Sequence, residues 1–204
     1  MASVYDLKPR FQALLRPLVR QLARLGIIAN QVTIAAALLS LAAGAALALL
    51  AGSRASLLLM PLVLFLRMAL NAIDGMLARE HGQKSRLGAL LNEIGDVVSD
   101  GALYLALVPA LAPFGATAAP IIVFVFAAVL TEFTGVLGLT IGGQRRYDGP
   151  MGKSDRAAAI GFVTFIIALG VRGGVWLDVV MTLLALLAIW TSVRRARASL
   201  GETP

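Results

Sequence analysis

Long runs of apolar residues, separated by short groups of charged, polar and small residues, fill the chain from about residue 30 to residue 193. A helix that crosses the hydrocarbon core of a bilayer needs about 20 mostly apolar residues. The pattern predicts six such helices, of which the fifth is the shortest. Their ranges are 30–51, 56–78, 87–111, 117–141, 156–171 and 175–193. We therefore expect an all-α, polytopic membrane protein in which residues 27–193 form the transmembrane domain.

The segment before the first span has a different periodicity. Its apolar residues recur at helical spacing, and its arginines lie mostly off that stripe. The stripe comprises Phe11, Leu14, Leu15, Leu18, Leu22 and Leu25. Such a segment is typical of an amphipathic helix that lies on the membrane surface. A helix that packs on the membrane domain is the alternative interpretation.

The charge distribution indicates an orientation. Residues of the chain are 59% hydrophobic and only 14% charged, whereas soluble domains carry roughly 25% charged residues. Basic residues concentrate before the first span, between the second and third, between the fourth and fifth, and after the sixth. By the positive-inside rule this side faces the cytoplasm. We therefore expect an inner-membrane protein with both termini cytoplasmic, residues 1–26 being an N-terminal segment and residues 194–204 a basic tail.

Composition also excludes several kinds of site. The chain has no cysteine, which excludes disulfides, thiolate metal sites and cysteine nucleophiles. Its single histidine, His81, excludes a metal site built from several histidines. The net charge of +7 flanks apolar spans instead of forming a basic patch, so we expect the lipid bilayer, and no nucleic acid, as a partner.

Two predicted spans carry polar residues on one helical face. The second span places Asn71, Asp74 and Ala78 together. The third span places four residues at steps of four, with Glu93 beside them: Gly88, Asn92, Asp96 and Asp100. Ionisable groups inside a span are costly and usually functional. Because the loop between these spans is short, we expect their cytoplasmic halves to face each other, and such oxygen ligands suit a hard cation, Mg²⁺ or Mn²⁺.

Gly75 and Gly88 lie beside this polar group. A glycine there lets a ligand approach the helix backbone. Close packing of small residues between membrane helices is the alternative explanation.

These residues form a motif with fixed spacing, Asn71-x2-Asp74-Gly75-x2-Ala78-Arg79-x8-Gly88-x3-Asn92-x3-Asp96. It resembles the signature of the CDP-alcohol phosphatidyltransferase family, Asp-x2-Asp-Gly-x2-Ala-Arg-x8-Gly-x3-Asp-x3-Asp. The stretch "ANQVT", residues 29–33, is similar to the family's Pro-Asn-x2-Thr entrance to the first span, with alanine in place of proline. The resemblance also implies a homodimer.

The resemblance implies a reaction in which an alcohol attacks the lipid-linked phosphorus of a CDP-lipid, usually CDP-diacylglycerol, and CMP leaves. It implies that Asp96 is the general base. It also implies one or two Mg²⁺ or Mn²⁺ ions. The metal positions are Asn71, Asp74, Asn92 and Asp96, with Glu93 and Asp100 as additional candidates. The positions that contact the nucleotide or diphosphate are Asn30, Thr33, Gly75, Ala78, Arg79 and Gly88.

Two positions depart from the family signature, because Asn71 and Asn92 stand where it has aspartate. The change lowers the formal charge of the ligand set from −4 to −2. Glu93 and Asp100 can restore charge, the site can hold one metal instead of two, or the protein can bind a CDP-lipid without catalysis. We favour retained activity, with Glu93 compensating for Asn92. A cation- or proton-coupled transporter, with Asp74, Asp96 and Asp100 in a relay, is a further alternative. It leaves four residues of the motif unexplained: Gly75, Ala78, Arg79 and Gly88.

A second group of cations lies in the loop between the fourth and fifth spans. Its members are Arg145, Arg146, Lys153 and Arg156. They form either a pocket for a phosphorylated acceptor or the diphosphate, or the ordinary positive-inside decoration. Glu132, inside the fourth span, is expected to pair with Arg67 of the second span, or else to line a pocket.

Overall fold

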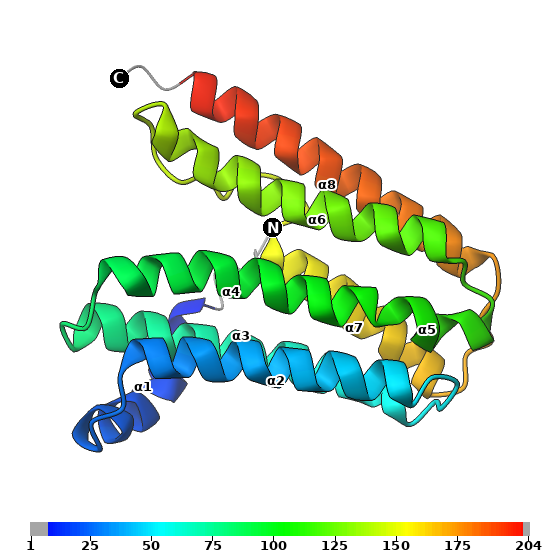
Figure 1. Ribbon diagram of the computed structural model, residues 1–204, viewed down its shortest axis with the longest axis horizontal. Coiled ribbons are helices and arrows are strands. Elements are labelled where there is room, and N and C mark those ends of the chain that lie inside the picture. The colour runs from blue at the N-terminus through cyan, green and yellow to red at the C-terminus, as the bar shows by residue number, and fades with distance from the viewer. Residues whose placement is uncertain (1–7, 202–204) are drawn as a thin grey trace.

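The computed structural model of the protein describes residues 8–201. All the regular elements in this part of the chain are helices, which confirms the all-α class (Figure 1). The α-helices are α1 Lys8–Arg24, α2 Ala29–Leu49, α3 Leu59–Glu80, α4 Arg86–Leu105, α5 Leu107–Leu111, α6 Ala118–Thr140, α7 Lys153–Ala168 and α8 Trp176–Leu200. Two 3₁₀ turns, η2 Ser56–Leu58 and η3 Ala112–Phe114, lead into α3 and follow α5.

Within residues 8–201, five helical segments are long and apolar enough to cross a membrane. They are Ala29–Leu49, Ser56–Glu80, Arg86–Phe114, Ala118–Thr140 and Trp176–Leu200. The remaining predicted span corresponds to α7, which has only 16 residues. This helix ends at Ala168, close to the turn at Gly170, whose φ is +108°, and its polar first turn leaves an even shorter apolar stretch. Five of the six predicted spans are thus found by length and composition.

Two predicted boundaries need correction. The third span is not one continuous helix, since α4 ends at Leu105 and α5 begins at Leu107. Pro109 explains the break, because its ring clashes with the carbonyl four residues earlier, which is that of Leu105. The sixth span does not end at residue 193, because α8 continues to Leu200. Most of the predicted basic tail that the structure describes is therefore helix.

The long helices form one bundle, and their connections lie at its two ends except for the one between α6 and α7, which runs back along the bundle (Figure 1). Helix α2 packs against both α3 and α4, α6 pairs with α8, and α7 packs against α3. Helix α4 also contacts α6, which joins the two parts of the bundle. Helix α7 begins part-way along the bundle instead of at its end (Figure 1).

Helix α1 packs against α3. Val19 is fully buried, and Leu15 and Leu22 pack with it against the start of α2 and the end of α3. Leu14 and Leu25, from the same predicted stripe, stay exposed. Part of the predicted stripe therefore packs against the bundle, and the other part remains exposed as an apolar surface.

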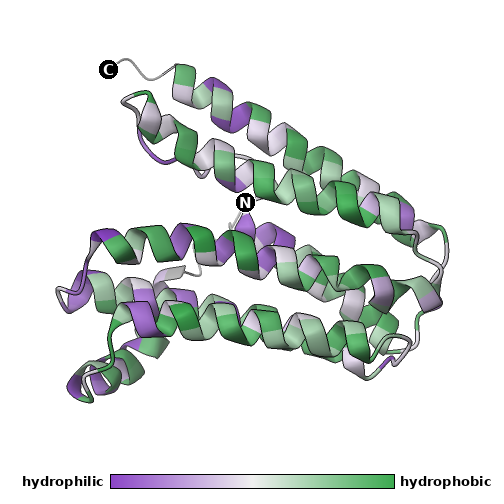
Figure 2. Cartoon of the chain, viewed as in Figure 1, coloured by the Kyte–Doolittle hydropathy of each residue, from purple (hydrophilic) through white to green (hydrophobic). Residues whose placement is uncertain are grey.

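The outside of the bundle is largely apolar (Figure 2). Leu49, Phe126 and Phe162, for example, are largely exposed. Soluble proteins rarely leave contiguous apolar surfaces this large uncovered. A lipid-facing surface accounts for them.

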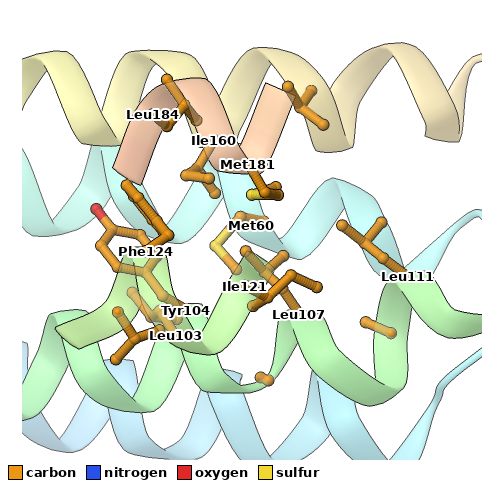
Figure 3. Close-up of a cluster of buried hydrophobic side chains, with 14 of the residues drawn as sticks. Met60, Leu103, Tyr104, Leu107, Leu111, Ile121, Phe124, Ile160, Met181 and Leu184 are labelled. Atoms are coloured by element: carbon orange, nitrogen blue, oxygen red, sulfur yellow. The ribbon is translucent and has the colours of Figure 1, made fainter. Parts of the chain in front are cut away.

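Inside the bundle, two apolar clusters are separated by charge. The larger cluster includes Met60 of α3, Tyr104 of α4 and Phe124 of α6, and Figure 3 shows part of it. The smaller one joins α1, α2 and α3 around Met76. Between them on α3 lies Arg67, which is only 3% exposed. The polar residues of the motif occupy this intermediate level.

Small residues allow the close contact of α2 with α4. A Cβ atom on Gly44 would lie 2.6 Å from the backbone oxygen of Ala102, whereas a Cβ on Gly101 would meet nothing within 4 Å. We expect Gly44→Ala to lower the free energy of unfolding by about 1–3 kcal/mol through overpacking. The matched control Gly101→Ala should raise it by roughly 0.5–1 kcal/mol, since alanine is the better helix former. Thermal unfolding in detergent micelles measures both, and equal effects would contradict this packing.

Candidate functional site

The motif residues of α3 and α4 converge, as the sequence predicts. Asn71 donates from its amide nitrogen to Oδ1 of Asp96 over 3.4 Å. Asp74 and Asp96 are both buried, at 5% and 8% exposure. Helix α2 contributes Thr33, whose hydroxyl donates to Oδ2 of Asp74 at 2.7 Å. Three helices therefore build the centre of the site, and Asn92 lies half-buried one turn before Asp96 on α4.

The start of α2 is held against the start of α4. The Gln83 side chain accepts a hydrogen bond from the Ala29 backbone at 2.7 Å. Ser85 caps α4 by accepting from the Gly88 backbone at 2.9 Å. A Cβ on Gly88 would lie 2.7 Å from the amide oxygen of Asn30. In this structure the glycine thus makes room for Asn30, and two of the positions expected to contact the nucleotide lie side by side.

Gly75 is covered by a side chain of its own helix. A Cβ there would lie 2.9 Å from a guanidinium nitrogen of Arg79. The Arg79 side chain therefore folds back along α3 over Gly75, and Ala78 is half-buried beside it. Small residues beside an arginine fit the predicted contact with a diphosphate, and they fit close packing as well.

Asp96 has cationic neighbours from two other helices. Lys153, the first residue of α7, donates from Nζ to Oδ1 of Asp96. Arg67 of α3 donates to the same oxygen at 3.5 Å and to the Asp96 backbone oxygen at 3.1 Å. Lys153 was predicted on the acceptor side of the site, and the structure brings it to the centre.

Asp100, an additional metal candidate, is occupied by arginines. Arg67 donates to its Oδ1, and Arg156 donates to its Oδ2 at 2.9 Å. Arg156 is fully buried and also donates to Glu132 at 2.7 Å. Asp100 therefore acts here as the anion of a buried ion-pair network.

The prediction that Glu132 pairs with Arg67 is wrong, although Glu132 does form ion pairs. Its partners are Arg156, at 2.7 Å, and Arg145, at 3.1 Å. Arg67 is directed to α4 instead, where Asp96 and Asp100 hold it. Spacing along one helix fixes which face a charge occupies, but not which neighbouring helix supplies its partner.

Glu93 is bound by an arginine of the loop before α7. Arg145 donates to its two carboxylate oxygens at 2.6 and 2.8 Å. Burial is the largest single influence on Arg145 and acts to lower its pKa, but the hydrogen bonds to Glu93 and the nearby negative charges of Glu93 and Glu132 together raise that pKa above its ordinary value. Arg146, in the same loop, pairs with Asp148 at 2.8 Å. In this structure Glu93 is thus the ion-pair partner of Arg145.

Sequence reasoning missed Arg195, which it assigned to the basic tail. The side chain is buried, donates to the Thr131 backbone oxygen and donates to the Asp148 backbone oxygen at 3.1 Å. A signal was present, because Thr191, Arg195 and Ser199 follow one another at steps of four and all are buried. This polar stripe marks an inward face that continues beyond the apolar span.

The side chains at the centre suit a hard divalent cation. Asp74 and Asp96 offer carboxylate oxygens, and Asn71 and Asn92 offer amide oxygens. Among residues 8–201, no three side chains of His, Cys, Asp or Glu are gathered as a metal centre. Glu93 and Asp100, the additional metal candidates, are paired here with Arg145 and with two other arginines.

The sequence model of one family, described as CDP-alcohol phosphatidyltransferase, matches residues 26–193. The chain belongs to the CDP-alcohol phosphatidyltransferase family. This confirms the resemblance inferred from the motif. A curated relative, "Inner membrane protein YnbA" of Escherichia coli (strain K12), is 46% identical over 198 residues, which are 97% of this chain and 96% of the relative.

Solved structures share the fold of this chain. Mycobacterium tuberculosis phosphatidylinositol phosphate synthase (PgsA1) with CDP-DAG bound has a TM-score of 0.75 and 22% identity, and the match covers 91% of this chain and 92% of that one. The same synthase in complex with manganese and citrate also has a TM-score of 0.75 and 22% identity, with 91% and 88% covered.

The ion-pair network predicts a large cost for losing Arg156. Arg156→Gln leaves Asp100 and Glu132 buried without their shared cation, which typically costs about 3–5 kcal/mol. The matched control is Arg16→Gln, because Arg16 pairs with Glu80 at 3.0 Å on the surface, where ion pairs contribute little. Thermal unfolding should show a large drop in Tm for Arg156→Gln and almost none for the control. Equal melting temperatures for the two variants would show that the network does not stabilise the fold.

Proposed function

We propose that this protein is an inner-membrane enzyme that transfers a phosphatidyl group from a CDP-linked lipid, CDP-diacylglycerol, to an alcohol and releases CMP, in phospholipid synthesis. The observation that carries this proposal is the convergence of Asp74 and Asp96 beside Thr33, with the spacing of the family motif. Family membership and the relative's name, an inner membrane protein, support it.

The solved structures support the substrate and the cofactor. The Mycobacterium tuberculosis synthase was crystallised with CDP-DAG and, separately, with manganese. By analogy, the nucleotide and diphosphate would lie against Asn30, Thr33, Gly75, Ala78, Arg79 and Gly88. The metal, Mg²⁺ or Mn²⁺, would be held by Asp74 and Asp96 with amide oxygens nearby. When bound, it would neutralise the phosphate charge and orient the phosphorus for attack.

The chain's own residues account for the remaining steps. Asp96 takes the proton of the acceptor hydroxyl. The oxygen of that hydroxyl attacks the lipid-linked phosphorus, and the bond between this phosphorus and CMP breaks. Thr33 fixes the Asp74 carboxylate, and Arg67 and Lys153 fix that of Asp96. Arg79 is placed to meet phosphate oxygens. The acceptor would enter from the side of the loop that carries Arg145 and Arg146.

The arginines expected to bind the acceptor do not form an open basic pocket. Arg145 and Arg156 are both in ion pairs with carboxylates. A phosphorylated acceptor would have to compete with Glu93 or Glu132 for these guanidinium groups. We therefore propose an alcohol as the acceptor, without specifying whether it is phosphorylated.

We also propose six spans, with α7 as the fifth. Its Phe162, Phe165 and Leu169 are exposed on one face, which suits contact with lipid. Both termini are then cytoplasmic, and α1 lies on the cytoplasmic leaflet through Leu14 and Leu25. The domain bounds stay as residues 1–26, 27–193 and 194–204, with α8 extending into the last. A homodimer is the assembly that family resemblance favours.

A catalytically silent CDP-lipid-binding protein is the second candidate. Asn71 and Asn92 favour it, because the two amides remove charge from the ligand set. It predicts binding of the nucleotide without release of CMP.

The topology predicts the side from which single cysteines are labelled. The chain has no cysteine, so labelling has no background from the protein itself. His81→Cys and Pro150→Cys should react with a membrane-impermeant maleimide only from the cytoplasmic side. Ser53→Cys and Arg172→Cys should react only from the opposite side. If Pro150→Cys and Arg172→Cys react from the same side, α7 does not cross the membrane.

Catalysis predicts release of CMP. Purified protein in lipid nanodiscs, given CDP-diacylglycerol, Mn²⁺ and a panel of neutral and phosphorylated alcohols, should release CMP with at least one acceptor. Asp96→Asn should lower the rate at least about 100-fold, within the typical contribution of general acid–base catalysis. The control Asp178→Asn changes a carboxylate at the other end of the bundle, where Thr117 donates to it at 2.8 Å, and should leave the rate unchanged. Nucleotide binding without CMP release from any acceptor would support the silent protein instead.

A further inference from the structure

We infer that the ammonium group of Lys153 supplies the positive charge of a second metal ion, so that the site holds one divalent cation per chain. This inference rests on the metal-dependent site of the proposed function. It concerns the number of ions and the residue that replaces one of them.

The four metal positions of the motif carry too few negative charges for two divalent cations. Among the four metal positions of the motif only Asp74 and Asp96 carry charge, since Asn71 and Asn92 are amides. Asn71 moreover presents its amide nitrogen to Asp96, which makes it a hydrogen-bond donor in this arrangement. Two divalent ions close together, with two carboxylates between them, would repel each other strongly.

Nitrogen donors occupy one oxygen of Asp96. Lys153 contacts Oδ1, and Arg67 and Asn71 approach the same atom at 3.5 and 3.4 Å. An ion placed on Oδ1 would lie against an ammonium and a guanidinium group. The structure therefore gives this oxygen a built-in cation and keeps a metal away from it.

The surrounding side chains add no negative charge to this balance, and Arg195, 3.9 Å from Glu132, adds a further buried positive charge. Arg67 and Arg156 share Asp100, and Arg145 is held by Glu93 and Glu132. What remains at the centre is two carboxylates and one ammonium, a net charge of −1. One divalent ion is therefore attracted, and it leaves the centre at +1 to meet a diphosphate.

The position of Lys153 is fixed by the chain around it. Gly152 donates from its backbone to Asp155 at 3.0 Å, which sets the start of α7. Since α7 begins inside the bundle, its first side chain is level with the middle of α4. The Lys153 side chain is 29% exposed, so its remaining protons can also face phosphate oxygens, as the sequence predicted for this residue.

Counting bound Mn²⁺ tests the inference without turnover. Electron paramagnetic resonance titration of the protein in nanodiscs, with CDP-diacylglycerol present, should give one ion per wild-type chain. Lys153→Gln should keep that number and bind the ion about tenfold tighter or more, because a cation has been removed next to it. The triple variant Lys153→Gln, Asn71→Asp, Asn92→Asp should bind two ions.

Two controls separate this role from a structural one. Lys153→Arg keeps the charge and should keep both the number of ions and the affinity. Lys84→Gln removes a lysine from the exposed loop between α3 and α4 and should change neither. A purely structural Lys153 would lower Tm without changing Mn²⁺ affinity.

Two ions on the wild-type chain would overturn the inference, as would none. An unchanged affinity in Lys153→Gln would also overturn it, and so would a single ion on the triple variant. The proposed transferase activity is judged separately by CMP release. One bound ion without CMP release rejects the activity and leaves the inference standing. CMP release with two bound ions supports the activity and rejects the inference.

Discussion

Arg156 enters the bundle at the start of α7 and is enclosed on all sides, with one hydrogen bond to Asp100 on α4 and another to Glu132 on α6. A guanidinium group without these partners would carry a large desolvation penalty in an apolar surrounding. Three helices that follow different loops must therefore meet at this level. Asp100 also pairs with Arg67 of α3, and Glu132 lies 3.9 Å from Arg195 of α8. Charge, more than apolar contact, sets the mutual positions of the helices here.

This layer of charge connects stability to chemistry. Asp96 belongs to the candidate site and also to the network, because Arg67 contacts both Asp96 and Asp100. In a water-poor interior such pairs hold their side chains in place more firmly than in water. A carboxylate fixed in this way needs little reorganisation when a phosphate arrives. The two apolar clusters on either side of this charged layer limit where water and substrates can enter.

The sequence predicted what depends on periodicity and spacing, and less of what depends on contacts between helices. Apolar runs located five spans, and the motif correctly joined Asp74 with Asp96. The partner of Glu132 could not be found this way, because a helix face can meet either of two neighbours. Arg195 was assigned to the tail because it follows an apolar run, and only the step-of-four spacing to Thr191 and Ser199 indicated an inward face. Hydropathy does not indicate that α7 begins inside the bundle, because a loop that enters a bundle is as polar as a loop on its surface.

The position of Asp96 along α4 has a consequence for the lipid. Ten residues separate it from Arg86, where α4 begins, so it lies about 15 Å along the helix axis from that end. Under the proposed topology Arg86–Phe114 is one span of 29 residues, longer than the roughly 20 that the hydrocarbon layer needs, so its first turns lie among the headgroups and Asp96 lies below the surface of the hydrocarbon layer but short of its midplane. A phospholipid headgroup normally rests at the bilayer surface. The substrate would therefore have to lower its diphosphate into the bilayer, or the bilayer would have to thin around the protein. Either way, the polar side chains of α3 and α4 would meet cytidine and phosphate below the bilayer surface, while the acyl chains stay outside among Phe126, Phe162 and the other exposed apolar side chains.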